Sequence, residues 1–210
     1  YCNLVCMKPV PVKITDWWAD NIRLTHTLST FEELQSFKAS NKDEVVRLHF
    51  GLQGNYSFKY LQLDQTYDLV GGHHNLMYSK EFDIEVTPRT NTIETFGVQF
   101  PVDQFLAYTA NGNDQLQRFG EAVMAGRGVM LADNWGGLNL RIQEVINQVL
   151  YCNYSEPMRK LFLLSKSLEL LVLSAESYQL SSKENFIKTS TDKEKIIAVR
   201  DLINSRLNNP

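Results

Sequence analysis

The sequence has no surplus of basic residues and no apolar run long enough to cross a membrane. Its 21 Lys and Arg residues are outnumbered by 24 Asp and Glu residues, which gives a formal net charge of −3. We expect such a chain to bind DNA poorly by itself, because nucleic-acid binding depends on clustered positive charge. The longest strongly apolar segment, between Leu161 and Ala175, is interrupted by Lys166 and Glu169. No membrane span is therefore predicted.

Cysteine is scarce and lacks the spacing of a metal site. Cys2, Cys6 and Cys152 are an odd number, and nothing in the sequence fixes a pairing among them. A reducing cytoplasm is the simplest setting for such a chain, so we predict a cytoplasmic protein. We also predict no cofactor. Residue 1 is Tyr, without an initiating Met or a secretion leader, which indicates a trimmed chain or missing upstream sequence.

Up to about residue 100 the apolar residues recur with a period of two, which is typical of β-strands. In the segment 46–50, Val46, Leu48 and Phe50 share one face, while Arg47 and His49 point to the other. The same pattern recurs at Tyr56, Phe58 and Tyr60, at Phe82, Ile84 and Val86, and at Phe96, Val98 and Phe100. Short strands joined by Gly and Asn turns predict a half-open antiparallel β barrel of the cupin-like kind.

After Pro101 the apolar spacing changes to three and four, which predicts helices. We expect one helix from Leu138 to Cys152 and a longer one from Glu156 to about Gln179. A polar linker and a final helix beginning at Asp192 follow. The fold class is therefore α+β, with a β barrel over residues 1–135, a helical module over 136–180, and a linker with a helix over 181–210.

The predicted helix 156–179 carries an apolar seam with alternating spacings of three and four. The seam consists of Leu161, Leu164, Leu168, Leu171, Ala175 and Tyr178. Further leucines give the helix a second apolar side, so it must be buried twice. The seam is interpreted either as an interface with a second copy of the chain or as packing against the helix 138–152.

Several segments resemble AraC/XylS-type transcription regulators. The resemblance rests on the β-rich first half, on the helix segment 161–171 and on a last helix over 197–207 before Pro210. The stretch 48–52 with Gly54, and the segment 75–78, look like the branch that includes regulators responsive to the siderophore pyochelin. In that family the chain continues into two helix-turn-helix motifs, which this sequence lacks.

The resemblance implies that the barrel binds an effector, that the following helices form a homodimer, and that the absent C-terminal domain reads DNA. Candidate effector-binding residues are Arg47, His49, Tyr56, Phe58 and Tyr60. The alternatives are that Arg47 and His49 are solvated, and that the aromatic stripe is simple core. Which face the barrel encloses decides between them.

No catalytic constellation is recognisable, because a nucleophile elbow, a phosphate-binding glycine loop and a plausible Cys–His–acid set are all absent. His73 and His74 invite a metal interpretation, but adjacent residues point to opposite faces of a strand. We predict no metal and no enzymatic activity. Two alternatives stay open: a stand-alone cupin-like enzyme or small-molecule-binding protein, and a plain dimerisation module with a filled barrel.

Overall fold

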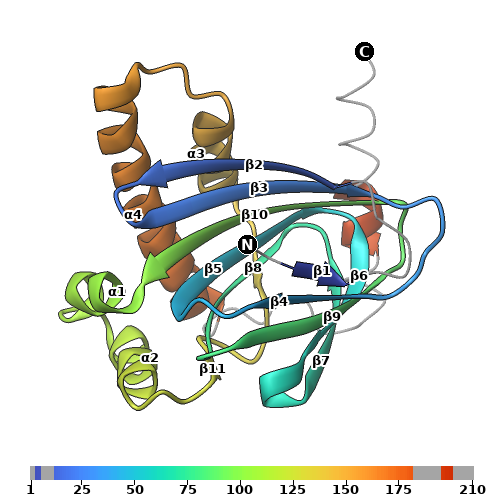
Figure 1. Ribbon diagram of the computed structural model, residues 1–210, viewed down its shortest axis with the longest axis horizontal. Coiled ribbons are helices and arrows are strands. Elements are labelled where there is room, and N and C mark those ends of the chain that lie inside the picture. Colours follow the sequence, from blue (N-terminus) through green and yellow to red (C-terminus); the bar gives the residue numbers. More distant parts are fainter. Residues whose placement is uncertain (1–2, 6–11, 182–194, 201–210) are drawn as a thin grey trace. The chain divides into compact units, whose positions relative to one another are not determined.

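The computed structural model describes residues 3–5, 12–181 and 195–200. Two antiparallel sheets face one another in the unit formed by residues 1–177 (Figure 1). The five-stranded sheet has the order β1 (Asn3–Val5), β4 (Phe37–Asn41), β9 (Phe82–Pro88), β6 (Asn55–Tyr60), β7 (Gln65–Val70). The seven-stranded sheet has the order β11 (Val129–Met130), β8 (His73–Tyr78), β5 (Val45–Gln53), β10 (Thr92–Pro101), β3 (Ile22–Thr30), β2 (Val12–Ala19), with β12 (Gly136–Gly137) also paired to β8.

The two sheets do not close into a continuous barrel, which agrees with the predicted half-open form. Short connections join the two sheets, and the one between β5 and β6 turns at Gly54 with φ of 97°. A Cβ at Gly54 would lie 2.3 Å from the carbonyl oxygen of Thr92, so this turn requires glycine. The α+β, cupin-like fold class is confirmed.

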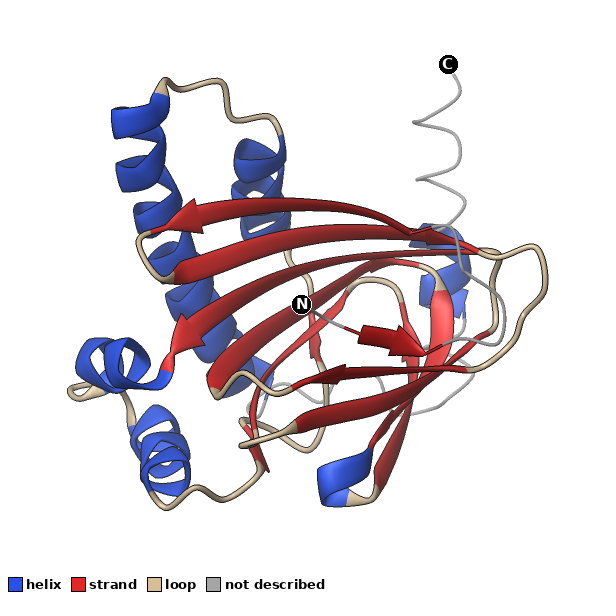
Figure 2. Cartoon of the chain, viewed as in Figure 1, coloured by secondary structure: helices blue, strands red, loops and turns tan. Residues whose placement is uncertain are grey.

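Helices follow the strands, as the change of period predicts (Figure 2). They are α1 (Val102–Thr109), α2 (Asp114–Met124), α3 (Leu140–Leu150) and α4 (Glu156–Ser181), besides a short 3-10 turn, η1 (Leu61–Leu63), between β6 and β7. Asn113 and Asn139 cap α2 and α3, since their side chains accept hydrogen bonds from the backbone N–H groups of Leu116 and Ile142. None of the described helices is long and apolar enough to span a bilayer.

Helices α3 and α4 cover the outer face of the seven-stranded sheet (Figure 1). That face carries Val46, Leu48 and Phe50 from β5, all of them buried. Their alternate neighbours Arg47 and His49 consequently point to the inner side, toward the five-stranded sheet. The helices thus cover the outer face of the large sheet, and its inner face borders the space between the two sheets.

The second unit comprises residues 178–210. Its described parts are the end of α4 and a helical stretch over residues 195–200. The predicted polar linker and most of the final helix from Asp192 lie outside the described residues. Cys2 and Cys6, near the N-terminus, lie outside them as well. The predicted boundaries 1–135, 136–180 and 181–210 stay a prediction.

Candidate functional site

A cavity of about 490 Å³ lies between the two sheets. Strands of both sheets line it, and their inward side chains alternate with outward ones. Its volume falls within the range of about 300–1,000 Å³ that is typical of small-molecule sites. The space between the sheets is therefore large enough for a ligand.

The wall formed by the seven-stranded sheet carries most of the polar side chains of the cavity, among apolar residues of the same strands. Strands β2, β3, β5 and β10 contribute Asp16, Arg23, Thr25, Thr27, Ser29, Arg47, His49, Thr95 and Gln99 to it. Arg23 donates two hydrogen bonds to Asp16, of 3.0 and 2.8 Å, and Thr25 donates a third of 2.7 Å. Partial burial acts to raise the pKa of Asp16, but these hydrogen bonds and the Arg23 charge lower it overall.

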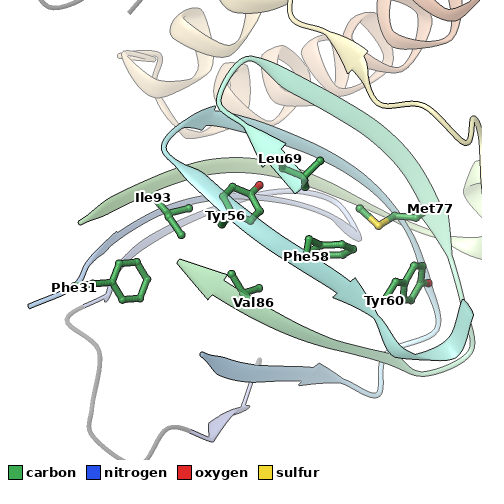
Figure 3. Packing of buried hydrophobic residues seen from close by; sticks show 8 residues of the cluster. All are labelled: Phe31, Tyr56, Phe58, Tyr60, Leu69, Met77, Val86 and Ile93. Carbon is green, nitrogen blue, oxygen red and sulfur yellow. The ribbon is translucent and has the colours of Figure 1, made fainter. Parts of the chain in front are cut away.

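The opposite wall, formed by the five-stranded sheet, is mainly apolar and aromatic, with Asn41 as a polar exception. It contributes Phe37, Ala39, Tyr56, Phe58, Phe82, Ile84 and Val86. Figure 3 shows Tyr56, Phe58 and Tyr60 in a row on β6, among other buried residues of this cluster. The guanidinium of Arg47 lies over the Phe82 ring, 4.4 Å from its centre, and so connects the two walls. A ligand in this cavity meets polar groups on one side and aromatic surface on the other.

Three side chains form a hydrogen-bonded chain at one end of the cavity. The Tyr56 hydroxyl lies 3.1 Å from His49 Nε2 and 2.9 Å from His73 Nε2. His73 Nδ1 in turn donates to the carbonyl oxygen of Val70. Trp135 packs edge-on against both imidazoles, with ring centres 5.7 Å from His49 and 5.1 Å from His73. The Trp135 ring thus contacts both imidazoles of this hydrogen-bonded chain.

Burial keeps His49 and Tyr56 of this group uncharged. It lowers the pKa of His49 to about 3, with the neighbouring charges of His73 and His74 acting in the same direction. Burial also raises the pKa of Tyr56 above its ordinary value. At neutral pH the cavity therefore presents a neutral imidazole and a neutral phenol.

The structure brings four of the five candidate effector residues together on the cavity surface: Arg47, His49, Tyr56 and Phe58. Tyr60 is fully buried, donates a 2.6 Å hydrogen bond to Ser79 and does not line this cavity. His73 and His74 do point to opposite faces of β8, because His73 contacts Tyr56 while His74 contacts Ser177 of α4 at 3.0 Å.

Sequence reasoning missed the hydroxyl-bearing wall of β3 and the pairing of His49 with His73. Thr25, Thr27 and Ser29 alternate with Leu24 and Leu28, so the period-two pattern contained the signal. No local spacing in the sequence connects His49 with His73. The β5–β8 register, which sets Gly51 opposite His73, creates that proximity.

The predicted seam on α4 divides along its length. Its first part is accessible, with Leu161 60% exposed and Leu164 and Leu168 half-buried. Its second part, Leu171, Ala175 and Tyr178, is buried. Val172, 55% exposed, and Met158, 55% exposed, extend the accessible side. The accessible residues follow helical spacing and form one stripe, defined here as the α4 stripe: Met158, Leu161, Leu164, Leu168 and Val172.

An α+β domain with facing antiparallel sheets, a ligand-sized cavity between them and helices packed behind one sheet has a cupin-like fold. The chain belongs to the family of the regulatory protein PchR N-terminal domain, whose model matches residues 20–186. This match confirms the resemblance to N-terminal domains of AraC-type regulators. A search of curated proteins gives no match.

Solved structures are similar to this chain at low sequence identity. The AraC-like transcriptional activator CuxR is 10% identical with a TM-score of 0.51, over 80% of this chain and 56% of that chain. This chain thus corresponds to about half the length of CuxR. A cupin superfamily protein from Desulfitobacterium hafniense is 13% identical over 46% of this chain and 83% of its own, with a TM-score of 0.36. A putative ethanolamine utilization protein from Salmonella typhimurium is 15% identical over 43% of this chain and 69% of its own, with a TM-score of 0.34.

Proposed function

We propose that this chain is the effector-binding and dimerisation part of a cytoplasmic AraC-type transcription regulator, and not an enzyme. The observation that carries the proposal is the cavity of about 490 Å³, polar on one wall and aromatic on the other, in a member of a regulatory-domain family. DNA binding belongs to a C-terminal domain of the family. The family match does not favour the alternative of a stand-alone cupin-like enzyme.

The effector contacts in this proposal are Arg47 and His49 on the polar wall and Tyr56 and Phe58 on the aromatic wall. An aromatic body stacks on Phe58 and Tyr56, while polar substituents meet the opposite wall. Such a division suits a molecule of mixed character better than a sugar or a purely aliphatic chain.

A cavity-filling substitution tests effector binding. Thr27→Phe places a ring in the middle of the polar wall, because Thr27 lies on β3 and lines the cavity. We expect the affinity for the apolar probe 2-methoxynaphthalene, measured by fluorescence titration, to fall at least about tenfold as its space is taken. Thr30→Phe is the matched control, since Thr30 is exposed at the end of the same strand. Equal affinities in both variants would place the probe outside this cavity.

Dimerisation in this proposal uses the α4 stripe. The stripe faces outward from a helix whose other side, including Leu163 and Leu170, is buried in the chain's own core. A second copy of the chain covers the stripe by helix packing, as leucines at spacings of three and four allow. The homodimer then positions two DNA-binding domains.

Leu161→Asp is expected to weaken the dimer at least about thirtyfold, because the interface must then bury an unpaired carboxylate. Light scattering coupled to size-exclusion chromatography over a concentration series measures this. Leu34→Asp is the matched control, since Leu34 is a 47% exposed leucine in the β3–β4 loop, away from α4. A Leu161→Asp variant as dimeric as the parent would remove the α4 stripe from the interface.

Strand β8 provides a physical connection between the cavity and α4 in this proposal. Its residue His73 takes part in the hydrogen-bonded chain that reaches the cavity, and the next residue, His74, contacts Ser177 of α4. A ligand that shifts β8 therefore acts on both sides of the sheet. The effector shifts the population of dimer arrangements only if it binds one arrangement more tightly than the other.

A further inference from the structure

The hydrogen-bonded chain His49–Tyr56–His73 ends on a backbone carbonyl, which fixes a proton on His73 Nδ1. The Val70 oxygen can only accept, so His73 Nδ1 carries a proton and donates. In the neutral imidazole with its proton on Nδ1, the other nitrogen, Nε2, accepts. The Tyr56 hydroxyl therefore donates to His73 Nε2, 2.9 Å away.

The direction of the Tyr56 hydrogen bond determines which nitrogen of His49 carries the proton. Tyr56 has used its single proton on His73, so its oxygen accepts from His49 Nε2, 3.1 Å away. His49 is then protonated on Nε2, and its Nδ1 is a hydrogen-bond acceptor. Within the described part of the chain, Nδ1 has no hydrogen-bond partner, while the His49 side chain lines the cavity. Its low pKa, about 3, keeps this nitrogen unprotonated at neutral pH.

We infer that His49 Nδ1 selects ligands that offer a hydrogen-bond donor, such as a phenol, an amide or a heterocyclic N–H, on a planar and largely apolar body. His49 is the specificity-determining residue, and Tyr56 and His73 are positioning residues that hold its tautomer. This inference rests on the proposed function, because it concerns the ligand of the same cavity. A ligand that presents only acceptors leaves Nδ1 desolvated without a partner, which lowers its affinity.

Gly51 is part of the same arrangement. A Cβ at this position would lie 2.2 Å from Cε1 and 2.3 Å from Nε2 of His73. The His73 ring therefore lies directly across the glycine, where it reaches both Val70 and Tyr56. Because glycine has no Cβ, there is room for the imidazole at this point, which indicates a defined position for the ring.

The tautomer is tested without any ligand by ¹⁵N NMR of the histidine side chains in the intact chain. We expect His49 to be protonated on Nε2 with a bare Nδ1, and Tyr56→Phe to abolish this fixed state by removing the bridging hydroxyl. Tyr60→Phe is the matched control, because it removes the neighbouring hydroxyl of the same strand, which bonds Ser79 and does not line the cavity. A proton on His49 Nδ1 in the parent chain would overturn the inference.

Ligand selection is tested with two probes of nearly the same shape, 2-naphthol and 2-methoxynaphthalene, of which only the first is a donor. We expect the parent chain and Tyr60→Phe to bind 2-naphthol about tenfold more tightly, and Tyr56→Phe to reduce this ratio to about twofold or less. Because the two probes have nearly the same shape, a general change of cavity shape affects both affinities similarly and leaves their ratio unchanged. Equal affinities in the parent would overturn the inference and leave the effector cavity in place, whereas no binding of either probe would also contradict the proposed function. If Tyr56→Phe fails to fold, the tautomer and the probe ratio of the parent chain still decide.

Discussion

Acidification from about pH 6.5 to about pH 5 is expected to lower the free energy of unfolding steeply, because two buried histidines must stay neutral in the folded chain. Burial and the neighbouring histidines lower the pKa of His49 to about 3, and burial with the charge of His73 lowers the pKa of His74 to about 4. In the unfolded chain both groups titrate near the ordinary value of 6.5.

Between these values the unfolded state binds more protons than the folded state, so stability falls as the pH falls. Each histidine contributes a slope of up to about 1.4 kcal/mol per pH unit in this window. The contribution is fully present above about pH 6.5 and is lost progressively toward the folded-state pKa values. Urea unfolding at a series of pH values measures the slope.

His74→Gln provides the control for this pH dependence. A glutamine retains a polar group near Ser177, which His74 contacts at 3.0 Å, but takes up no proton. We expect the variant to lose up to half of the slope, whatever its absolute stability at neutral pH. A slope equal to that of the parent would show that His74 titrates normally in the folded chain.

The periodicity of the sequence predicts most of the fold, because strand and helix burial follow local rules. The alternation in β5 correctly separates Val46, Leu48 and Phe50 from Arg47 and His49. Periodicity alone does not reveal which of the two faces encloses the cavity. That depends on whether helices α3 and α4 cover the outer or the inner side of the large sheet, which is a tertiary choice.

The candidate site was predictable only in part for the same reason. Arg47, His49, Tyr56 and Phe58 stand out locally as polar or aromatic residues on strands. His73 joins them through the pairing of β5 with β8 and the turn at Gly71 and Gly72, and Asp16 pairs with Arg23 across the β2–β3 hairpin. Contacts of this kind depend on which strands pair and in which register, and the alternation within a single strand does not reveal its partner.

Gly51→Ala is expected to destabilise the chain by about 2–4 kcal/mol, although alanine in a strand ordinarily stabilises relative to glycine. The new methyl group collides with a ring that cannot move cheaply, since His73 is buried and uses both nitrogens in hydrogen bonds. Swinging the imidazole away breaks both bonds and leaves the Tyr56 hydroxyl and the Val70 carbonyl without them. Thermal unfolding measures the loss as a lower Tm.

Gly97→Ala is the matched control for Gly51→Ala. Gly97 also lies in a strand of the large sheet and lines the cavity, but a Cβ there meets only the Leu48 carbonyl oxygen, at 3.7 Å. Its substitution is expected to change stability by less than about 1 kcal/mol. In a His73→Ala background the cost of Gly51→Ala should largely vanish, because the colliding ring is gone. A cost that persists without the ring would assign it to the β5 backbone and would remove Gly51 from the group of residues that positions His49.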